Sequence, residues 1–324
     1  MPPLPTADAL PTADAAGRFV RQRSQYCNWI TPDGAAGPTG DAGFTAARDR
    51  YHLYVSYACP WAHRTLILRA LKGLERLLPI SVVHPRMGPE GWSFEPGPGV
   101  VEDPLHAADF LSQVYRADPR PFDGHATTPL LWDKAQRRIV SNESADILRM
   151  FNSAFDDLGA RPGDYYPKEL RSEIDGLVGP MYHQLNNGVY RAGFARTQAA
   201  YEEAARGVFV QLDELEARLA GRRYLCGTRF TEADVRLFVT LVRFDAAYHG
   251  HFKCNLRRLS DYPALSGYTR DVYQMPAIRA TVHLDHIKQH YYQSHPALDP
   301  TAIVPLGPEL HFDAPHGRGL LSNS

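Results

Sequence analysis

Long apolar runs, stripes of basic residues and clustered cysteines are all missing from this chain of 324 residues. No apolar segment approaches the ~20 residues that a membrane-spanning helix needs. The formal net charge is −1, and no basic patch is present that would attract nucleic acid. The N-terminal residues lack the charged and apolar regions of a signal peptide. We therefore expect a protein that neither enters a membrane nor binds nucleic acid.

The chain has only four cysteines, at positions 27, 59, 226 and 254. Their wide spacing matches neither a disulfide framework nor a zinc-binding motif. Cysteines used so sparingly are typical of a reducing compartment. We expect no metal ion, and we expect the protein to be cytoplasmic. Cys226 and Cys254 are interpreted as small buried apolar side chains.

Three regions follow one another along the chain, whose hydrophobic fraction of 44% suits a large core in two domains. Residues 1–45 are irregular in pattern and are expected to form an N-terminal arm. Residues 46–155 alternate strand and helix signals. Residues 165–324 carry helical patterns only and end in an extended tail. The predicted fold class is therefore α/β followed by all-α.

The order of elements in the second region is β-α-β, a helix, and then β-β-α. We expect strands at 51–55, 79–84, 129–133 and 138–140, and helices from residue 60, over 106–115 and over 142–150. This order matches a thioredoxin-like domain. In the third region we expect helices over 166–187, 197–220, 231–247, 261–274 and 276–292. Thr231 and Asp234 form the pattern of a capping box, which starts a buried helix.

The stretch from Cys59 to Ala62 is the strongest chemical signal in the chain. It follows a strand and precedes a helix, and Pro60 suits the first helical position. Cys59 would then lie at the N-cap, where free N–H groups and the helix dipole favour a thiolate, the reactive form of the side chain. Ala62 occupies the place of a second cysteine, so this is no dithiol site. The alternative interpretation is a buried structural cysteine.

Several segments together resemble a known family. They are Cys59-Pro60-Trp61-Ala62-His63-Arg64-Thr65, Gly91-Trp92-Ser93-Phe94, Pro129-Leu130-Leu131-Trp132-Asp133, Ser141-Asn142-Glu143-Ser144, the run from Asn186 to Phe194, the run from His251 to Asn255 and the run from His286 to Tyr292. With the thioredoxin-like order and the Phe-Thr-x-Ala-Asp motif at residue 230, they are similar to the glutathione transferase superfamily. Within it they resemble the glutathionyl-hydroquinone reductases, also called xi-class glutathione transferases.

The resemblance implies a reaction with glutathione as co-substrate and a homodimeric protein. Cys59 attacks the sulfur of a glutathionyl-hydroquinone, and the hydroquinone leaves. A second glutathione then resolves the mixed disulfide on Cys59 and releases oxidised glutathione. Ala62 agrees with such a cycle, because a single cysteine suffices for it.

The resemblance also implies a glutathione site. Pro129 corresponds to the cis-proline of the superfamily, and the backbone of Thr128 before it pairs with the cysteinyl part of glutathione. Thr128 is a departure, because the family more often has an apolar residue there. Glu143 and Ser144 correspond to the residues that hold the γ-glutamyl end, which suits a helix start with free N–H groups and a carboxylate for the ammonium.

Further contacts are implied for both ends of the substrate. Trp92 resembles the tryptophan that lies against glutathione, and Arg116 is expected to meet a glutathione carboxylate. The aromatic part is expected between Cys59 and the helical domain, near Tyr190, Tyr248 and Tyr291. A phenol there can bond a hydroquinone oxygen or protonate the leaving carbon. Tyr190 and Tyr291 are the candidates for that catalytic role.

Two other patterns carry weaker signals. His286 and His290 have a spacing that can bind zinc, but no third ligand is near, and we expect a solvent-exposed or cation-lined helix face. Tyr54, Ser56 and Tyr57 precede Cys59, and a hydroxyl acting on the glutathione thiolate would indicate a conjugating enzyme. Two functions stay open beside the reductase. One is a general glutathione thiol transferase, acting on protein mixed disulfides or dehydroascorbate, and the other is a non-catalytic binding module on a transferase fold.

Overall fold

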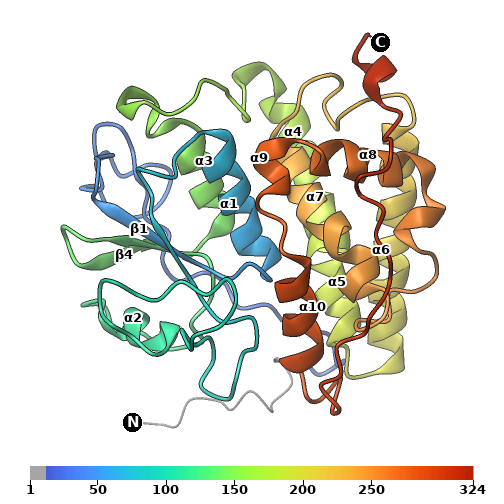
Figure 1. Cartoon of the computed structure of the whole chain (residues 1–324), viewed down its shortest axis with the longest axis horizontal. Helices are drawn as coiled ribbons and strands as arrows, with labels where there is room; N and C mark the ends of the chain where they lie inside the picture. The colour runs from blue at the N-terminus through green and yellow to red at the C-terminus, as the bar shows by residue number, and fades with distance from the viewer. Residues whose placement is uncertain (1–11, 324) are drawn as a thin grey trace. The chain divides into compact units, whose positions relative to one another are not determined.

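The computed structural model of the chain describes residues 12–323 (Figure 1). The first eleven residues of the predicted N-terminal arm lie outside this range. The described chain divides into two compact units, each built from separate stretches. The first unit comprises residues 23–164 and 281–302, and the second comprises residues 12–22, 165–280 and 303–323.

A four-stranded mixed sheet forms the centre of the first unit. Its elements are β1 (Tyr51–Val55), α1 (Pro60–Leu71), β2 (Ile80–Val82), α2 (Leu111–Arg116), β3 (Leu130–Asp133), β4 (Arg138–Ser141), α3 (Ser144–Ser153), the 3₁₀ turn η1 (Asp156–Leu158) and α10 (Leu284–Gln293). The strand order is β2-β1-β3-β4, with β1 parallel to β2 and the other neighbours antiparallel. Helices α1 and α3 lie together on one side of the sheet, and α2 lies on the other (Figure 1). The predicted thioredoxin-like order is confirmed.

The sheet is buried on both faces, which explains why its strands read as continuous apolar runs. Every residue of β1 and β3 is buried. Tyr54, Leu130 and Trp132 share one core cluster with Leu111 and Val114 of α2. Because side chains alternate across a strand, their neighbours Leu53, Val55 and Leu131 face the side of α1 and α3. This packing fixes where β1 ends and therefore where Cys59 lies.

The edge strand β4 is covered by the chain that precedes the sheet. Asn28 donates its backbone N–H to Val140 at 3.0 Å, and Asn142 donates to Tyr26 at 3.0 Å. Residues 26–28 thereby pair with β4 although they belong to no regular strand. Such pairing protects an edge that would otherwise offer free N–H and C=O groups.

The helix predicted over 106–115 is wrong in its first half. The structure forms α2 only from Leu111. Before it, the carboxylate of Asp103 accepts the backbone N–H groups of Leu105 at 3.0 Å, His106 at 3.1 Å and Ala108 at 3.3 Å. An aspartate that collects nearby N–H groups in this way favours a turn over a helix.

The helix predicted over 276–292 is broken into α9 (Pro276–Arg279) and α10. Thr281 and His283, which lie in the break, are occupied by contacts within the first unit. The hydroxyl of Thr281 lies 2.8 Å from Nε2 of His63 on α1, and the ring of His283 stacks on Tyr57 with centroids 3.7 Å apart. These contacts keep the segment out of a helix, and no local pattern in the sequence indicates them.

Helices make up the regular structure of the second unit. They are η2 (Lys168–Leu170), α4 (Arg171–Met181), η3 (Tyr182–Asn186), α5 (Gly188–Gly193), α6 (Gln198–Leu219), α7 (Glu232–Arg243), η4 (Phe244–Tyr248), η5 (Leu259–Asp261), α8 (Pro263–Tyr273), α9 and η6 (Gly319–Asn323). Within residues 165–280 and 303–323 only isolated β-bridges occur, so the all-helical prediction is confirmed. No helix in the described part of the chain is long and apolar enough to cross a membrane.

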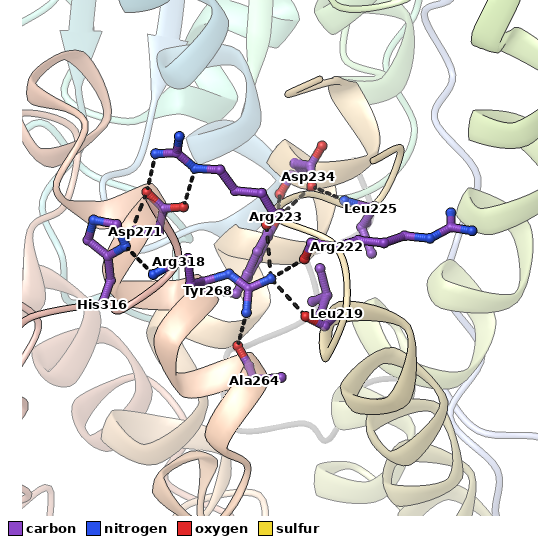
Figure 2. A network of polar contacts seen from close by, with 10 residues as sticks. All are labelled: Leu219, Arg222, Arg223, Leu225, Asp234, Ala264, Tyr268, Asp271, His316 and Arg318. Carbon is purple, nitrogen blue, oxygen red and sulfur yellow. Dashed lines mark hydrogen bonds and ion pairs between the residues drawn. The ribbon is translucent and has the colours of Figure 1, made fainter. Parts of the chain in front are cut away.

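A buried network at the start of α7 and along α8 fixes this unit (Figure 2). The predicted capping box at Thr231 and Asp234 is present. The carboxylate of Asp234 also accepts the N–H of Leu225 at 2.9 Å and the hydroxyl of Tyr268 at 3.1 Å. Burial raises the pKa of Asp234 to about 6, in spite of the hydrogen bonds it accepts.

The C-terminal tail is attached to the same network through Arg318 (Figure 2). This side chain is 4% exposed. Its guanidinium donates to the carbonyl oxygens of Leu219, the last residue of α6, and of Arg222 and Arg223 just beyond it. Carbonyls at a helix end lack intrahelical partners, and Arg318 supplies them from a distant part of the chain. His316 adds a contact of 3.7 Å to Asp271.

Candidate active site

Cys59 lies at the start of α1, as the sequence predicts. It is the N-cap residue, with extended backbone angles, and Pro60 follows at the first helical position. Its backbone N–H donates to Ser56 at 3.2 Å, which closes the short loop after β1. The side chain is partly exposed. A half-exposed sulfur at a helix N-terminus has both the access and the positive dipole end that thiol chemistry requires.

The loop before β3 lies directly against this sulfur. The Thr128–Pro129 peptide bond is cis. The Cys59 thiol donates to the carbonyl oxygen of Thr128 at 3.4 Å. The chain positions that the resemblance implies for the reacting sulfur and for the backbone of glutathione are therefore adjacent in space. A ligand that binds the Thr128 carbonyl competes with the resting hydrogen bond of the thiol.

Thr128 also carries an unusual hydroxyl group. The residue is 5% exposed, and its Oγ1 has no hydrogen-bond partner among the described residues. An apolar residue would avoid this cost, because a buried hydroxyl without a partner destabilises the fold by about 1–3 kcal/mol. The hydroxyl of the neighbouring Thr127, in contrast, lies 3.2 Å from the hydroxyl of Tyr115 and 3.3 Å from the amide of Asn142.

The start of α3 presents the predicted acidic and hydroxyl residues. Glu143 is the N-cap of α3, and its carboxylate accepts the N–H of Ala145 at 2.9 Å. The hydroxyl of Ser24 donates to the other carboxylate oxygen at 2.8 Å. Ser144 occupies the first helical position and is buried. The carboxylate is thus held in a fixed orientation at a helix start, where both a carboxylate and an ammonium group of a ligand find partners.

Trp92 lies in the long loop between β2 and α2 and is backed by α10. Its indole is mostly buried and stacks on the ring of His290, with centroids 4.7 Å apart and planes inclined by 26°. Nδ1 of His290 lies 3.1 Å from the carbonyl oxygen of Pro85, at the other end of the same loop. His290 therefore fixes both the ring and the loop of Trp92.

The expectation that His286 and His290 line an exposed or cation-lined face is wrong. Their side chains are 2% and 9% exposed. Nε2 of His286 lies 2.7 Å from the carbonyl oxygen of Pro98, so both histidines bind loop carbonyls. Helical spacing alone cannot distinguish a buried row of donors from an exposed one. Among the described residues no cluster of three or more His, Cys, Asp or Glu side chains could hold a metal ion.

Arg116 is less closely tied to these groups. It is the last residue of α2 and its side chain is exposed. No hydrogen bond or ion pair joins it to another of the described residues. Its expected contact with a glutathione carboxylate stays a prediction.

The three tyrosines expected at the aromatic substrate fall in different units. Tyr190 and Tyr248 belong to the second unit, where their rings are 6.1 Å apart and both contact Phe252. Tyr190 is half-buried, whereas Tyr248 is fully buried. Tyr291 lies on α10 in the first unit, fully buried beside His290. Their roles stay predictions.

Two of the three hydroxyl groups that precede Cys59, those of Tyr54 and Ser56, form hydrogen bonds in the structure. Tyr54 is buried and donates to Asp103 at 2.8 Å. The hydroxyl of Ser56, also buried, accepts the N–H of Ala58 at 3.2 Å. Burial raises the pKa of Tyr57, whose ring stacks on His283. These contacts favour Cys59 over a tyrosine or serine hydroxyl as the reactive group.

The other cysteines have no such environment. Cys226 and Cys254 are buried as predicted, and burial raises the pKa of their thiols to about 11 and about 12. Burial likewise raises the pKa of Cys27. A raised pKa keeps these groups in the unreactive thiol form at neutral pH.

Sequence reasoning missed Ser24 and His290 as parts of the site. Ser24 lies in the arm, 119 residues before its partner Glu143, and no motif marks it. The HxxxH spacing did mark His290, but as a possible metal ligand. Trp92 itself was the signal that could have identified such a partner, because an aromatic residue in a loop needs a surface to pack against.

The family models agree with the two-part architecture. Residues 58–154 match "Glutathione S-transferase, N-terminal domain", and residues 198–271 match "Glutathione S-transferase, C-terminal domain". The fold and these two matches thus define a protein of the glutathione S-transferase class.

Closer relatives specify the family. The chain is 55% identical over 309 residues to glutathionyl-hydroquinone reductase YqjG of Escherichia coli (strain K12), covering 95% of this chain and 94% of that protein. It is 54% identical over 297 residues to glutathionyl-hydroquinone reductase PcpF of Sphingobium chlorophenolicum, covering 92% of each. The glutathione-bound structure of YqjG superposes with a TM-score of 0.88 at 56% identity, covering 90% of this chain and 96% of that one. The chain belongs to the glutathionyl-hydroquinone reductase family.

Proposed function

We propose that this protein reduces glutathionyl-hydroquinones to hydroquinones through a mixed disulfide between Cys59 and glutathione. The observation that carries the proposal is the half-exposed thiol of Cys59 at the start of α1, 3.4 Å from the carbonyl oxygen of Thr128 beside a cis-proline. Membership of the family and the activity for which its relatives are named supply the substrate class.

The proposed cycle has two exchanges at sulfur. In the first, the Cys59 thiolate attacks the glutathione sulfur, an S–S bond forms and the C–S bond to the ring breaks. The ring carbon takes up a proton, and the electron pair of the C–S bond returns to the ring, so the hydroquinone leaves reduced. In the second, the thiolate of another glutathione attacks the mixed disulfide and regenerates the Cys59 thiolate. The products are one hydroquinone and one oxidised glutathione.

Glutathione is the co-substrate, and five residues in the first unit are proposed to hold it. The Thr128 carbonyl pairs with its cysteinyl backbone, and Glu143 and Ser144 receive its γ-glutamyl end. Trp92, backed by His290, forms a wall, and Arg116 meets a carboxylate. No metal ion takes part. Each role follows from the position of the residue in the family pattern. The contacts described above also support the roles of Thr128, Glu143 and Trp92, whereas the role of Arg116 depends on the family pattern alone.

The aromatic part of the substrate is proposed to contact Tyr190, Tyr248 and Tyr291. A phenol hydroxyl can donate to a hydroquinone oxygen and deliver the proton that the ring carbon needs. Tyr190 suits this role, because its half-buried ring leaves part of the side chain accessible. Replacement by phenylalanine, one position at a time, tests which hydroxyl matters.

One comparison separates the reductase from a general thiol transferase. Wild-type protein is given a glutathionyl-hydroquinone in one assay and a glutathionylated protein in another, both with excess glutathione. Release of hydroquinone with the higher kcat/KM supports the proposal. Efficient reduction of the protein disulfide without release of hydroquinone contradicts it and favours the transferase.

A non-catalytic module is tested by Cys59→Ser. The proposal expects turnover to disappear, with Cys254→Ser as the matched control for loss of a thiol. Full activity of Cys59→Ser would support the module. We also propose a homodimer in the cytoplasm, which sedimentation at micromolar concentration and cell fractionation test.

A further inference from the structure

Residues 16–18 are held against α6 and the short connection that joins it to α5, the helix that carries Tyr190. Arg196 donates its backbone N–H to Gly17 at 2.9 Å, and the hydroxyl of Thr197 donates to Ala16 at 2.9 Å. Arg18 pairs with Glu203 of α6 at 2.9 Å. Gly17 has a φ of 79°, and a Cβ there would lie 2.7 Å from Thr197. The path of residues 16–18 is therefore specified closely.

This path places Arg21 over the ring of Tyr190. Nε of Arg21 donates to Oδ1 of Asn187 at 2.6 Å, and its guanidinium carbon lies 4.8 Å from the centroid of the Tyr190 ring. The guanidinium also lies 5.3 Å from Phe19, whose ring contacts Phe194. This hydrogen bond and the aromatic contacts fix the orientation of the Arg21 side chain.

The surroundings of this charge are strongly aromatic. Phe194 and Phe252 lie 5.1 Å apart, and both contact the ring of Tyr190. A guanidinium stays protonated throughout the working range of any protein. Cation–π contacts of this kind are worth about 0.5–2 kcal/mol, depending on how far water is excluded. Arg21 thus brings a permanent positive charge to the face of a phenol ring inside an apolar cluster.

We propose that Arg21 is a positioning residue for the hydroquinone leaving group and acts through Tyr190. The inference rests on the proposed function. The ring carbon takes up a proton and a hydroquinone hydroxyl loses one. When the C–S bond then breaks, its electron pair passes through the ring to that oxygen, which carries negative charge until it is protonated again. A fixed cation that orients the Tyr190 phenol and raises the local potential favours this charged state.

The consequence is a preference for one class of substrate. Leaving groups that develop negative charge on a phenolic oxygen gain from the cation. An aliphatic thiol, which leaves from sulfur and carries no aromatic ring, does not. Arg21 is therefore expected to set the ratio of activity between glutathionylated phenols and aliphatic mixed disulfides, and to leave the chemistry of Cys59 unchanged.

The test compares three variants on two substrates at saturating glutathione. Arg21→Met removes the charge and keeps much of the side-chain volume, and Arg21→Lys restores the charge without the planar group. Arg23→Met is the matched control, because Arg23 is exposed two residues further on. The substrates are a glutathionyl-hydroquinone and the mixed disulfide of glutathione with 2-hydroxyethanethiol, and kcat and KM are measured for each.

The expected result is selective. Arg21→Met lowers kcat/KM for the glutathionyl-hydroquinone about tenfold and changes that for the aliphatic disulfide less than about twofold. Arg21→Lys recovers part of the loss, and Arg23→Met behaves as wild type. In a Tyr190→Phe background the effect of Arg21→Met is smaller, because the two side chains act together.

Other outcomes overturn the inference in distinguishable ways. If Arg21→Met loses kcat/KM equally on both substrates, or loses none, the role of Arg21 is overturned. The proposed function still holds in that case, provided that the wild-type protein releases hydroquinone. Wild-type protein that reduces the aliphatic disulfide but releases no hydroquinone overturns the proposed function, and the role of Arg21 falls with it.

Discussion

The thiol of Cys59 donates to the carbonyl oxygen of Thr128 at 3.4 Å, although 69 residues separate them in the chain. The contact joins the start of α1 to the loop that carries the cis-proline. It puts the proposed nucleophile next to the backbone group that is proposed to receive glutathione. Binding of glutathione at that carbonyl would free the thiol for reaction.

The unpartnered hydroxyl of Thr128 gives the first prediction. Thr128→Val removes a buried polar atom and keeps the shape of the side chain, so the free energy of unfolding should rise by about 1 kcal/mol. Thr127→Val is the control. It removes a hydroxyl that contacts Tyr115 and Asn142, so it should lower that free energy by a similar amount. Urea denaturation measures both, and a Thr128→Val protein of lower stability would show that the hydroxyl has a partner.

The stack between His290 and Trp92 leads to a prediction about glutathione affinity. His290→Ala removes the ring that supports the indole, and the dissociation constant for glutathione should rise several-fold, since such a pair is worth about 0.5–1.5 kcal/mol. His290→Phe keeps a ring and should retain more of the affinity. Titration calorimetry on Cys59→Ser variants measures binding without turnover. Unchanged affinity in His290→Ala would contradict the role of Trp92 as a wall.

The buried His52 and the half-buried His295 predict a loss of stability in acid. Burial lowers the pKa of His52 and of His295 to about 4, and Nε2 of His52 lies 2.8 Å from the hydroxyl of Ser81. A histidine in the unfolded chain has a pKa near 6.5. Below that pH the unfolded chain therefore binds protons that the native protein does not bind. The stabilisation is full above pH 6.5 and is lost as the pH falls to 4, by roughly 3 kcal/mol for each residue.

The difference between wild type and His52→Gln isolates this effect. Asp234 acts in the opposite direction: its raised pKa, about 6 in the native protein, makes its contribution fall as the pH rises from about 4 to about 6. Asp234 is present in both proteins, so its contribution cancels in the comparison. The free energy of unfolding, measured from pH 4 to pH 7, should therefore depend less steeply on pH in His52→Gln than in wild type. Parallel curves for the two proteins would refute the assignment.

Arg318 should be important for the stability of the helical unit. Arg318→Ala leaves three carbonyls at the end of α6 and just beyond it without their donor, and the free energy of unfolding should fall by roughly 2–4 kcal/mol (Figure 2). Arg279→Ala is the control, since Arg279 also holds the tail but pairs with Asp313 on the surface, and it should cost less than about 1 kcal/mol. Circular dichroism follows the unfolding of both variants. Equal losses of stability in the two would contradict a larger contribution from Arg318.

The parts of the site that are local in sequence were predictable. Cys59 at a helix start depends on Pro60 and on the preceding apolar strand, and the Thr231 capping box depends on residues three apart. Ser24 with Glu143, Arg21 with Tyr190 and the breaking of the last helix depend on contacts between distant segments. Nothing in a single sequence marks these partners. The turn at Asp103 was also missed, because an aspartate before an amphipathic pattern suits a helix start equally well.

The most direct test of the central claim is the mass of the intact protein after exposure to a glutathionyl-hydroquinone without free glutathione. The account predicts a single glutathione adduct, located on Cys59 by peptide mapping, formed together with one equivalent of hydroquinone and removed by added glutathione. Release of hydroquinone without an adduct, or an adduct on another cysteine, would contradict the account.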